Sequence, residues 1–137
     1  MPHPRIQALQ AKFREGCVRL GVDRGELPTE PTDRGWSHVE VHGEEYHVIA
    51  TDRGLETKRM ITRSEDDALY WLISEVVFDL ACQFEVEHHV AGRDYRRQIF
   101  GKRVELLHAI NPEWALRERA QIGEILLEKA PYRDNAP

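Results

Sequence analysis

The chain of 137 residues has the length of one ordinary domain, and a composition of 41% hydrophobic and 31% charged residues excludes a disordered chain. Its formal net charge of -5 disfavours nucleic-acid binding, which depends on cationic side chains that displace counterions from phosphates. No apolar run approaches the roughly 20 residues that cross a bilayer, and the N-terminus lacks the apolar core of a secretory signal. We therefore expect one cytoplasmic domain over residues 1–137, with no nucleic-acid or membrane partner.

The N-terminal part of the chain predicts one helix followed by a loop. Apolar residues recur at steps of three or four and form one stripe of an amphipathic helix, which Gly21 ends: Ile6, Leu9, Phe13, Cys17 and Leu20. Residues 21–35 combine glycine, proline and charge without an apolar period, so they are expected to form a connecting loop.

From Trp36 the apolar period changes to two, which predicts an antiparallel sheet over residues 36–62. A type II′ turn at Gly43-Glu44 would place Val41 opposite Tyr46 and Val39 opposite Val48, with both apolar pairs on one face. A second turn at Asp52-Arg53-Gly54 leads into residues 55–62. No register gives this third segment a clean apolar face, so we predict an edge strand there.

Residues 64–130 predict three helices. Ser64 and Asp67 resemble a capping box, with Asp in place of the usual Glu, and the wide apolar stripe that follows continues to Phe84 before a stop near Gly92. A second helix ends at Asn111-Pro112, which caps a last helix running to Pro131. The predicted fold class is α+β: an N-terminal helix, a three-stranded antiparallel β-meander, and three α-helices packed on one face of the sheet.

Charge is spread unevenly along the sequence. Residues 36–92 hold 12 acids against 4 bases, a net of -8, whereas residues 93–103 hold five bases against the single acid Asp94, a net of +4. This asymmetry predicts an electrical dipole. The basic stretch from Arg93 to Arg103 is either a solvated helix face or a surface that grips an anion or an acidic partner.

Two groupings of residues could bind a metal. The pairs Glu85 with His88 and Glu105 with His108 resemble half of a di-iron site, but a chain reversal near Gly92 would leave the two histidines offset by roughly 18 Å along the helices. His38, Glu40 and His42, with His47 opposite Glu40, form a better candidate. Alternating polar residues are nevertheless typical of any half-exposed sheet, so a solvated or partner-facing surface is the expectation, with no metal and no cofactor.

No catalytic apparatus is evident in the sequence. The chain has no phosphate-binding glycine loop and no nucleophile motif. Cys17 and Cys82 are too few for a disulfide framework, and each lies among apolar residues at helical spacing, which predicts reduced core thiols. We therefore do not expect an enzyme.

Motifs through the last two-thirds of the chain carry a family resemblance. They are Tyr46-His47-Val48, Asp52-Arg53-Gly54 with Glu56, the helix opening DDALYW from Asp66 to Trp71, Phe78 with Ala81, Asp94-Tyr95-Arg96-Arg97 with Phe100, Glu105-Leu106-Leu107, Asn111-Pro112-Glu113-Trp114, and Glu124-Ile125-Leu126 before Pro131-Tyr132. In these residues the chain resembles the bacterial polymorphic-toxin immunity proteins of immunity protein family 63. Residues 1–35 lie outside the resemblance and are expected to be a variable helix and loop.

The resemblance implies an antidote that binds and neutralises a cognate secreted toxin in the bacterial cytoplasm, with no catalytic residues. Because loops and polar sheet faces often carry recognition, the expected toxin-binding residues are His38, Glu40, His42, Glu45, Asp52 and Glu56. If the toxin is a nuclease, the acidic segment 36–92 could occupy its phosphate site. The alternatives are a metal-dependent enzyme using the hairpin histidines and a generic regulatory adaptor, and the sequence leaves monomer and dimer open.

Overall fold

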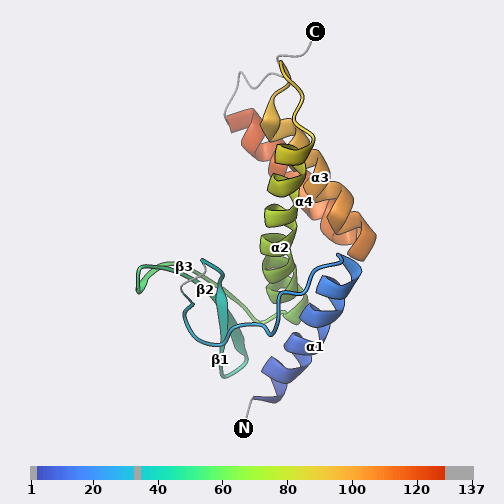
Figure 1. Ribbon diagram of the computed structural model, residues 1–137. Coiled ribbons are helices and arrows are strands. Elements are labelled where there is room, and N and C mark those ends of the chain that lie inside the picture. Colours follow the sequence, from blue (N-terminus) through green and yellow to red (C-terminus); the bar gives the residue numbers. More distant parts are fainter. Residues whose placement is uncertain (1–2, 33–34, 129–137) are drawn as a thin grey trace. The chain divides into compact units, whose positions relative to one another are not determined.

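Figure 1 shows the computed structural model, in which residues 3–32 and 35–128 are described. One helix is followed by a three-stranded antiparallel sheet and three further helices, so the predicted α+β element order is confirmed. The elements are α1 (Pro4–Arg19), β1 (His38–His42), β2 (Glu45–Asp52), β3 (Leu55–Thr62), α2 (Glu65–Glu87), α3 (Tyr95–Ile110) and α4 (Pro112–Glu128). The predicted helix end at Pro131 and the family motif at Pro131-Tyr132 lie outside the described residues.

The chain divides into two compact units, residues 1–75 and residues 76–137, and the boundary falls within α2. The first unit has a core of aliphatic and aromatic side chains that includes Leu9, Val39, Val48, Ile49, Tyr70 and Ile73. The second unit has its own buried set, which includes Val76, Val77, Ala81, Leu107, Trp114 and Ala115. A single domain over residues 1–137, with all three helices packed on one face of the sheet, stays a prediction.

In the first unit, α1 buries the predicted stripe. Ile6, Leu9, Phe13 and Cys17 are buried, and Leu20 caps the helix end before Gly21, whose φ is +75°. Burial raises the pKa of the Cys17 thiol, as expected for a reduced core cysteine. A β-carbon at Gly16 would lie 2.7 Å from Cδ1 of Ile73 on α2, so this contact between the two helices requires glycine.

The register of the β1–β2 hairpin is as predicted. Val41 pairs with Tyr46 and Val39 with Val48, and Gly43 has the positive φ that a two-residue type II′ turn needs at its first position. At the second turn, Arg53 and Gly54 both have positive φ, which is the pattern of a type I′ turn and produces the sharp reversal into β3.

A β-bulge explains why β3 has no clean apolar face in the sequence. Ala50 pairs with Lys58 but its neighbour Thr51 pairs with Glu56, so Thr57 is an extra residue in β3. One inserted residue moves every later side chain to the opposite face. The strand order β1-β2-β3 confirms that β3 is an edge strand.

Helix α2 begins with half of the predicted capping box. The Ser64 hydroxyl accepts a hydrogen bond from the Asp67 amide at 3.2 Å. The reciprocal bond was predicted wrongly, because the Asp67 carboxylate instead accepts from the Thr62 hydroxyl at 3.0 Å, and the Ser64 amide donates to that same hydroxyl. Asp is one methylene shorter than the Glu that usually reaches back to the cap, and the hydroxyl of Thr62 lies within its range.

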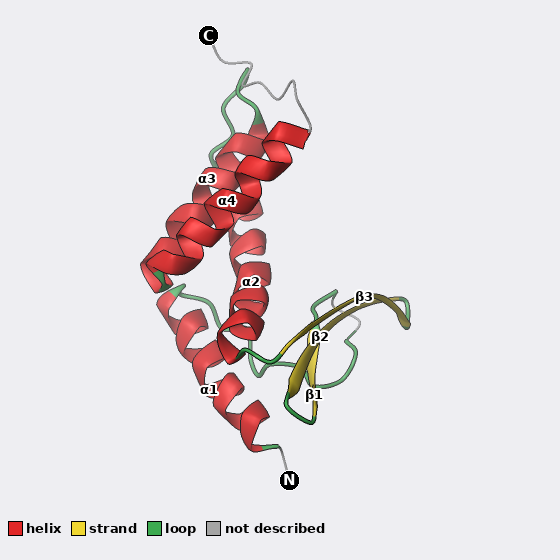
Figure 2. Ribbon diagram, turned by 180° about the vertical axis from the view of Figure 1, so that it is seen from behind, coloured by secondary structure: helices red, strands yellow, loops and turns green. Residues whose placement is uncertain are grey.

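In the second unit, α3 and α4 lie side by side in opposite directions (Figure 2). The turn between them is the predicted one: the side-chain oxygen of Asn111 accepts from the Glu113 amide at 3.0 Å. Lys102 on α3 lies over the Phe84 ring of α2, with Nζ 4.3 Å from its centre. Cys82 is half-buried, so its prediction as a core thiol is only partly correct.

Candidate functional site

One face of the sheet carries a cluster of charged and histidine side chains, which we call the charged sheet face. The β1–β2 register places three pairs on the face opposite Val39 and Val48. These pairs are His38 with Ile49, Glu40 with His47, and His42 with Glu45. The bulge directs Arg59 and Glu56 of β3 to the same face. The charged sheet face therefore consists of His38, Glu40, His42, Glu45, His47, Glu56 and Arg59.

Arg59 connects the three strands of this face. Its guanidinium donates two hydrogen bonds to the Glu56 carboxylate, at 2.7 and 2.9 Å, and one to Nδ1 of His47 at 2.7 Å. The same group lies 3.9 Å from Oε1 of Glu40. The bidentate bond to Arg59 lowers the pKa of Glu56 below its ordinary value and raises that of Arg59, so both remain charged.

The hydrogen bond from Arg59 determines the tautomer of His47. A guanidinium can only donate, so Nδ1 of His47 accepts in this hydrogen bond and the ring carries its proton on Nε2. That Nε2 proton points to the Glu45 carboxylate at 3.2 Å. Glu45, His47 and Arg59 thus form one directed chain of hydrogen bonds from β2 to β3.

Glu40 holds two histidines at the other end of the charged sheet face. His38 and His42 each direct Nε2 to one oxygen of its carboxylate, at 2.9 and 2.7 Å. The hydrogen bond from His38 is the main reason that the pKa of Glu40 is lowered, with the bond from His42 next. The His42 ring in turn lies 4.2 Å from the His47 ring, centre to centre.

The face that was expected to be solvated or to face a partner is only partly exposed. His38 is only 2% exposed and His47 only 8%, so neither presents a surface to a partner. The side chains of His42, Glu45 and Glu56 remain accessible, at 52%, 42% and 44%, and Glu40 is more than a third exposed. Asp52, the remaining predicted contact residue, is exposed at the second turn and has no part in the hydrogen-bond network described above.

The histidines and carboxylates of this face are bonded to one another and to Arg59. Among the side chains described in residues 3–32 and 35–123, no three from His, Cys, Asp or Glu are grouped as a metal ion would require. A guanidinium among them also opposes a second cation electrostatically. The arrangement consists of carboxylates held by donors behind them, and the pKa values of two of these carboxylates, Glu40 and Glu56, are lowered by their hydrogen bonds.

Arg59 and His47 are the members of the cluster that sequence analysis left out of the expected contact set. His47 could be identified from its predicted position opposite Glu40. Arg59 could not be identified, because the face on which its side chain lies depends on the bulge at Thr57. Neither residue type nor spacing predicts a bulge.

The other predicted groupings separate in the structure. Glu85 pairs with His89 at 2.6 Å instead of His88, and Glu105 pairs with Lys102 at 3.1 Å, so neither ExxH pair forms. In the basic stretch, Arg96 binds Asp94 at 3.0 Å and lowers the pKa of that carboxyl, and Arg103 is paired with Glu118. Much of this positive charge is therefore compensated by carboxylates of the same helical unit.

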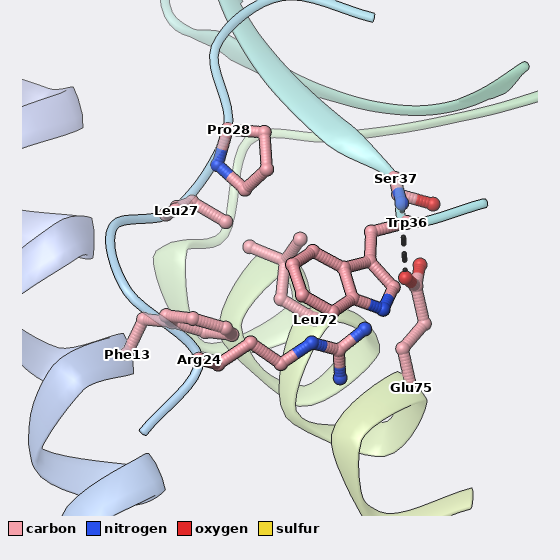
Figure 3. Close-up of a pocket in the computed structure, with 8 residues that line it drawn as sticks. All are labelled: Phe13, Arg24, Leu27, Pro28, Trp36, Ser37, Leu72 and Glu75. Carbon is pink, nitrogen blue, oxygen red and sulfur yellow. Dashed lines mark hydrogen bonds between the residues drawn. The ribbon is translucent and has the colours of Figure 1, made fainter. Parts of the chain in front are cut away.

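A cavity of about 10 Å³ lies between α1, the loop after it and the first part of α2 (Figure 3). The Arg24 guanidinium lies 4.0 Å from the centre of the Trp36 ring, and the Ser37 amide donates to the Glu75 carboxylate at 3.0 Å. Such a cavity accommodates about one water molecule. The arrangement anchors the loop, and with it the start of β1, on α2.

No helix in the described part of the chain combines the length and the apolar character needed to cross a membrane. Among curated proteins and among solved structures, none matches this chain. The family model described as Immunity protein 63 matches residues 42–124, which extend from the end of β1 into α4. This match covers more than half of the sequence and includes both the sheet and the helical unit. The chain belongs to the immunity protein 63 family.

Proposed function

We propose that this chain is an antidote that binds one cognate toxin of a polymorphic toxin system in the bacterial cytoplasm and blocks it, without catalysing a reaction. The observation that carries the proposal is the family match across residues 42–124. Immunity by binding requires a surface complementary to the toxin and no reactive centre. The hydrogen-bonded carboxylates and histidines of the charged sheet face suit that requirement.

The proposed contact surface comprises the predicted residues Glu40, His42, Glu45, Asp52 and Glu56, and the predicted residue His38 lies buried behind Glu40. The carboxylates of Glu40, Glu45 and Glu56 are held in place by hydrogen-bond donors behind them, so little side-chain entropy is lost when a partner binds them. The buried His38 contributes indirectly, because its hydrogen bond orients Glu40. If the toxin is a nuclease, these carboxylates would occupy the basic site that holds phosphate, and binding would weaken as salt concentration rises.

The test is co-expression with the toxin encoded beside the gene of this chain, scored by rescued growth and by purification of the complex. Charge reversal at two exposed positions, Glu45→Lys and Asp52→Lys, is expected to weaken the complex by about tenfold or more, since like charges would then meet at the contact. Glu113→Lys, an equal charge change on α4, is the matched control and should bind as the unmodified chain does.

Each result bears on a different part of the proposal. If the unmodified chain neither rescues growth nor binds the toxin, the proposed function is wrong. If it rescues growth and both charge reversals rescue equally well, the antidote function stands but the proposed contact surface is wrong.

A further inference from the structure

Strand β3 is an open edge of the sheet (Figure 1). Residues 55–59 are all exposed, and two large apolar side chains, Leu55 and Ile61, are 72% and 49% exposed. The opposite edge differs, because the loop before β1 covers it: the Val39 amide donates to the Pro28 carbonyl at 3.0 Å. One edge of the sheet is therefore partly closed by the chain itself, and the other is available.

The hydrogen-bond pattern identifies the backbone groups that β3 presents. Successive residues of an antiparallel strand point their N–H and C=O groups to alternate sides. The backbone amide of Val39 bonds to the loop, so the N–H and C=O groups of Val39 point away from β2. The backbone groups of its partner Val48 therefore point away from β1 and towards β3. Val48 pairs with Met60, which therefore bonds inward to β2.

It follows that Arg59 and Ile61, on either side of Met60, direct their N–H and C=O groups outward. In the described part of the chain, no turn, loop or side-chain hydrogen bond engages the amides of these two residues, which the pairing pattern directs away from β2. Unpaired strand-edge groups of this kind are a template for a further strand.

Charge on β3 distinguishes between possible occupants. Residues 55–63 carry three bases, Lys58, Arg59 and Arg63, against the single acid Glu56. Pairing β3 with a second copy of itself would bring two such basic strands within about 5 Å, where like charges repel.

We propose that β3 accepts an extended segment of the cognate toxin as a fourth strand of the sheet. This inference builds on the proposed antidote function and names the segment by its chemistry. Its backbone bonds to the outward groups of Arg59 and Ile61, an apolar side chain lies beside Ile61 on one face, and a carboxylate lies beside Lys58 on the other. The charged sheet face adjoins this edge through Arg59, so one toxin molecule can occupy both surfaces.

Ile61→Pro removes one outward N–H donor while leaving the inward ladder through Met60 intact, since proline is tolerated on the free side of an edge strand. Binding to the toxin domain encoded beside the gene, carrying an inactivating substitution, is expected to weaken by about tenfold or more. Ile61→Ala keeps the amide and should lose clearly less affinity. Lys58→Glu should weaken binding, and Arg14→Glu, the same charge change at an exposed position on α1, should not.

Amide hydrogen exchange of the unmodified chain, free and bound to the inactive toxin domain, tests the same point without a substitution. The Arg59 and Ile61 amides should exchange rapidly in the free chain and slowly in the complex. If these amides remain unprotected in a stable complex, or if Ile61→Pro binds as tightly as Ile61→Ala, the added strand is refuted while the antidote function stands. A dimer of the free chain that Ile61→Pro abolishes would make a second copy the occupant and overturn the proposal. If the chain binds no toxin at all, both proposals fail together.

Discussion

Removing one partner of the ion pair between Arg103 and Glu118 should destabilise the helical unit, residues 76–137, more than any single surface change. The Glu118 side chain is 2% exposed and that of Arg103 is 20% exposed. The Arg103 guanidinium also lies 5.5 Å from the centre of the Phe78 ring and 5.6 Å from that of Phe100. Two aromatic rings therefore lie beside a charge whose carboxylate partner, Glu118, is on α4.

The expected loss of unfolding free energy depends on which member of the ion pair each substitution leaves in place. Glu118→Ala removes the α4 carboxylate that pairs with the Arg103 guanidinium, and Arg103→Ala removes the guanidinium that pairs with an almost fully buried carboxylate. Removing one partner of a buried pair costs about 3–5 kcal/mol of unfolding free energy. The double replacement Glu118→Leu with Arg103→Met removes both charges, retains most of the volume, and is expected to cost close to zero or to stabilise by about 1 kcal/mol or more.

The assay is urea unfolding followed by circular dichroism, with hydrogen exchange of α3 and α4 amides to assign the loss to the helical unit. The two single alanine variants should be the least stable, with the double apolar variant well above both. Single variants that lose less than about 1 kcal/mol would show that the pair is effectively solvated and would refute the reasoning from burial.

Three further predictions concern the unit formed by residues 1–75. Gly16→Ala should destabilise the fold by about 1–2 kcal/mol, because its new β-carbon would clash with Cδ1 of the fully buried Ile73. Ile73→Val removes that Cδ1 atom and should relieve the clash. A double-mutant cycle measured by urea unfolding tests this coupling. Glu75→Ala should cost about 1–3 kcal/mol in thermal unfolding, because the buried Ser37 amide loses its acceptor. The lowered pKa of Glu40 stabilises the folded state above the ordinary value of 4.5, and this contribution is lost as pH falls through the folded pKa. Glu40→Gln should therefore destabilise near pH 7 and make little difference near pH 3 in pH-dependent urea titrations.

Matched controls separate these effects from general damage. Gly101→Ala, on α3, meets no atom within 4 Å and should stabilise by about 0.5–1 kcal/mol, the usual gain of alanine over glycine in a helix. Glu75→Gln keeps an acceptor for the Ser37 amide and should lose less stability than the alanine variant. A difference between Glu40→Gln and the unmodified chain that persists undiminished at acid pH would contradict the assigned role of the carboxylate.

Local patterns were sufficient for the order and limits of the main elements. Glycine at the first position of a two-residue turn and alternating valines determine the β1–β2 register, because turn geometry and a half-buried face allow no other pairing. The stripe on α1 and the cap at Asn111 are likewise determined by contacts within a few residues. The family motifs, spread over residues 42–124, can also be recognised from the sequence alone.

Tertiary structure alone decided which side chains form the candidate site. The bulge at Thr57 rotates Arg59 onto the histidine face, and burial of His38 and His47 converts a presumed solvated row into a hydrogen-bonded layer beneath accessible carboxylates. Both outcomes depend on residues distant in sequence, because a bulge reflects competition between neighbouring strands and burial depends on the segments packed around each residue. Patterning can establish that a sheet is present, but only the assembled strands establish which face, and which edge, remains available to a partner.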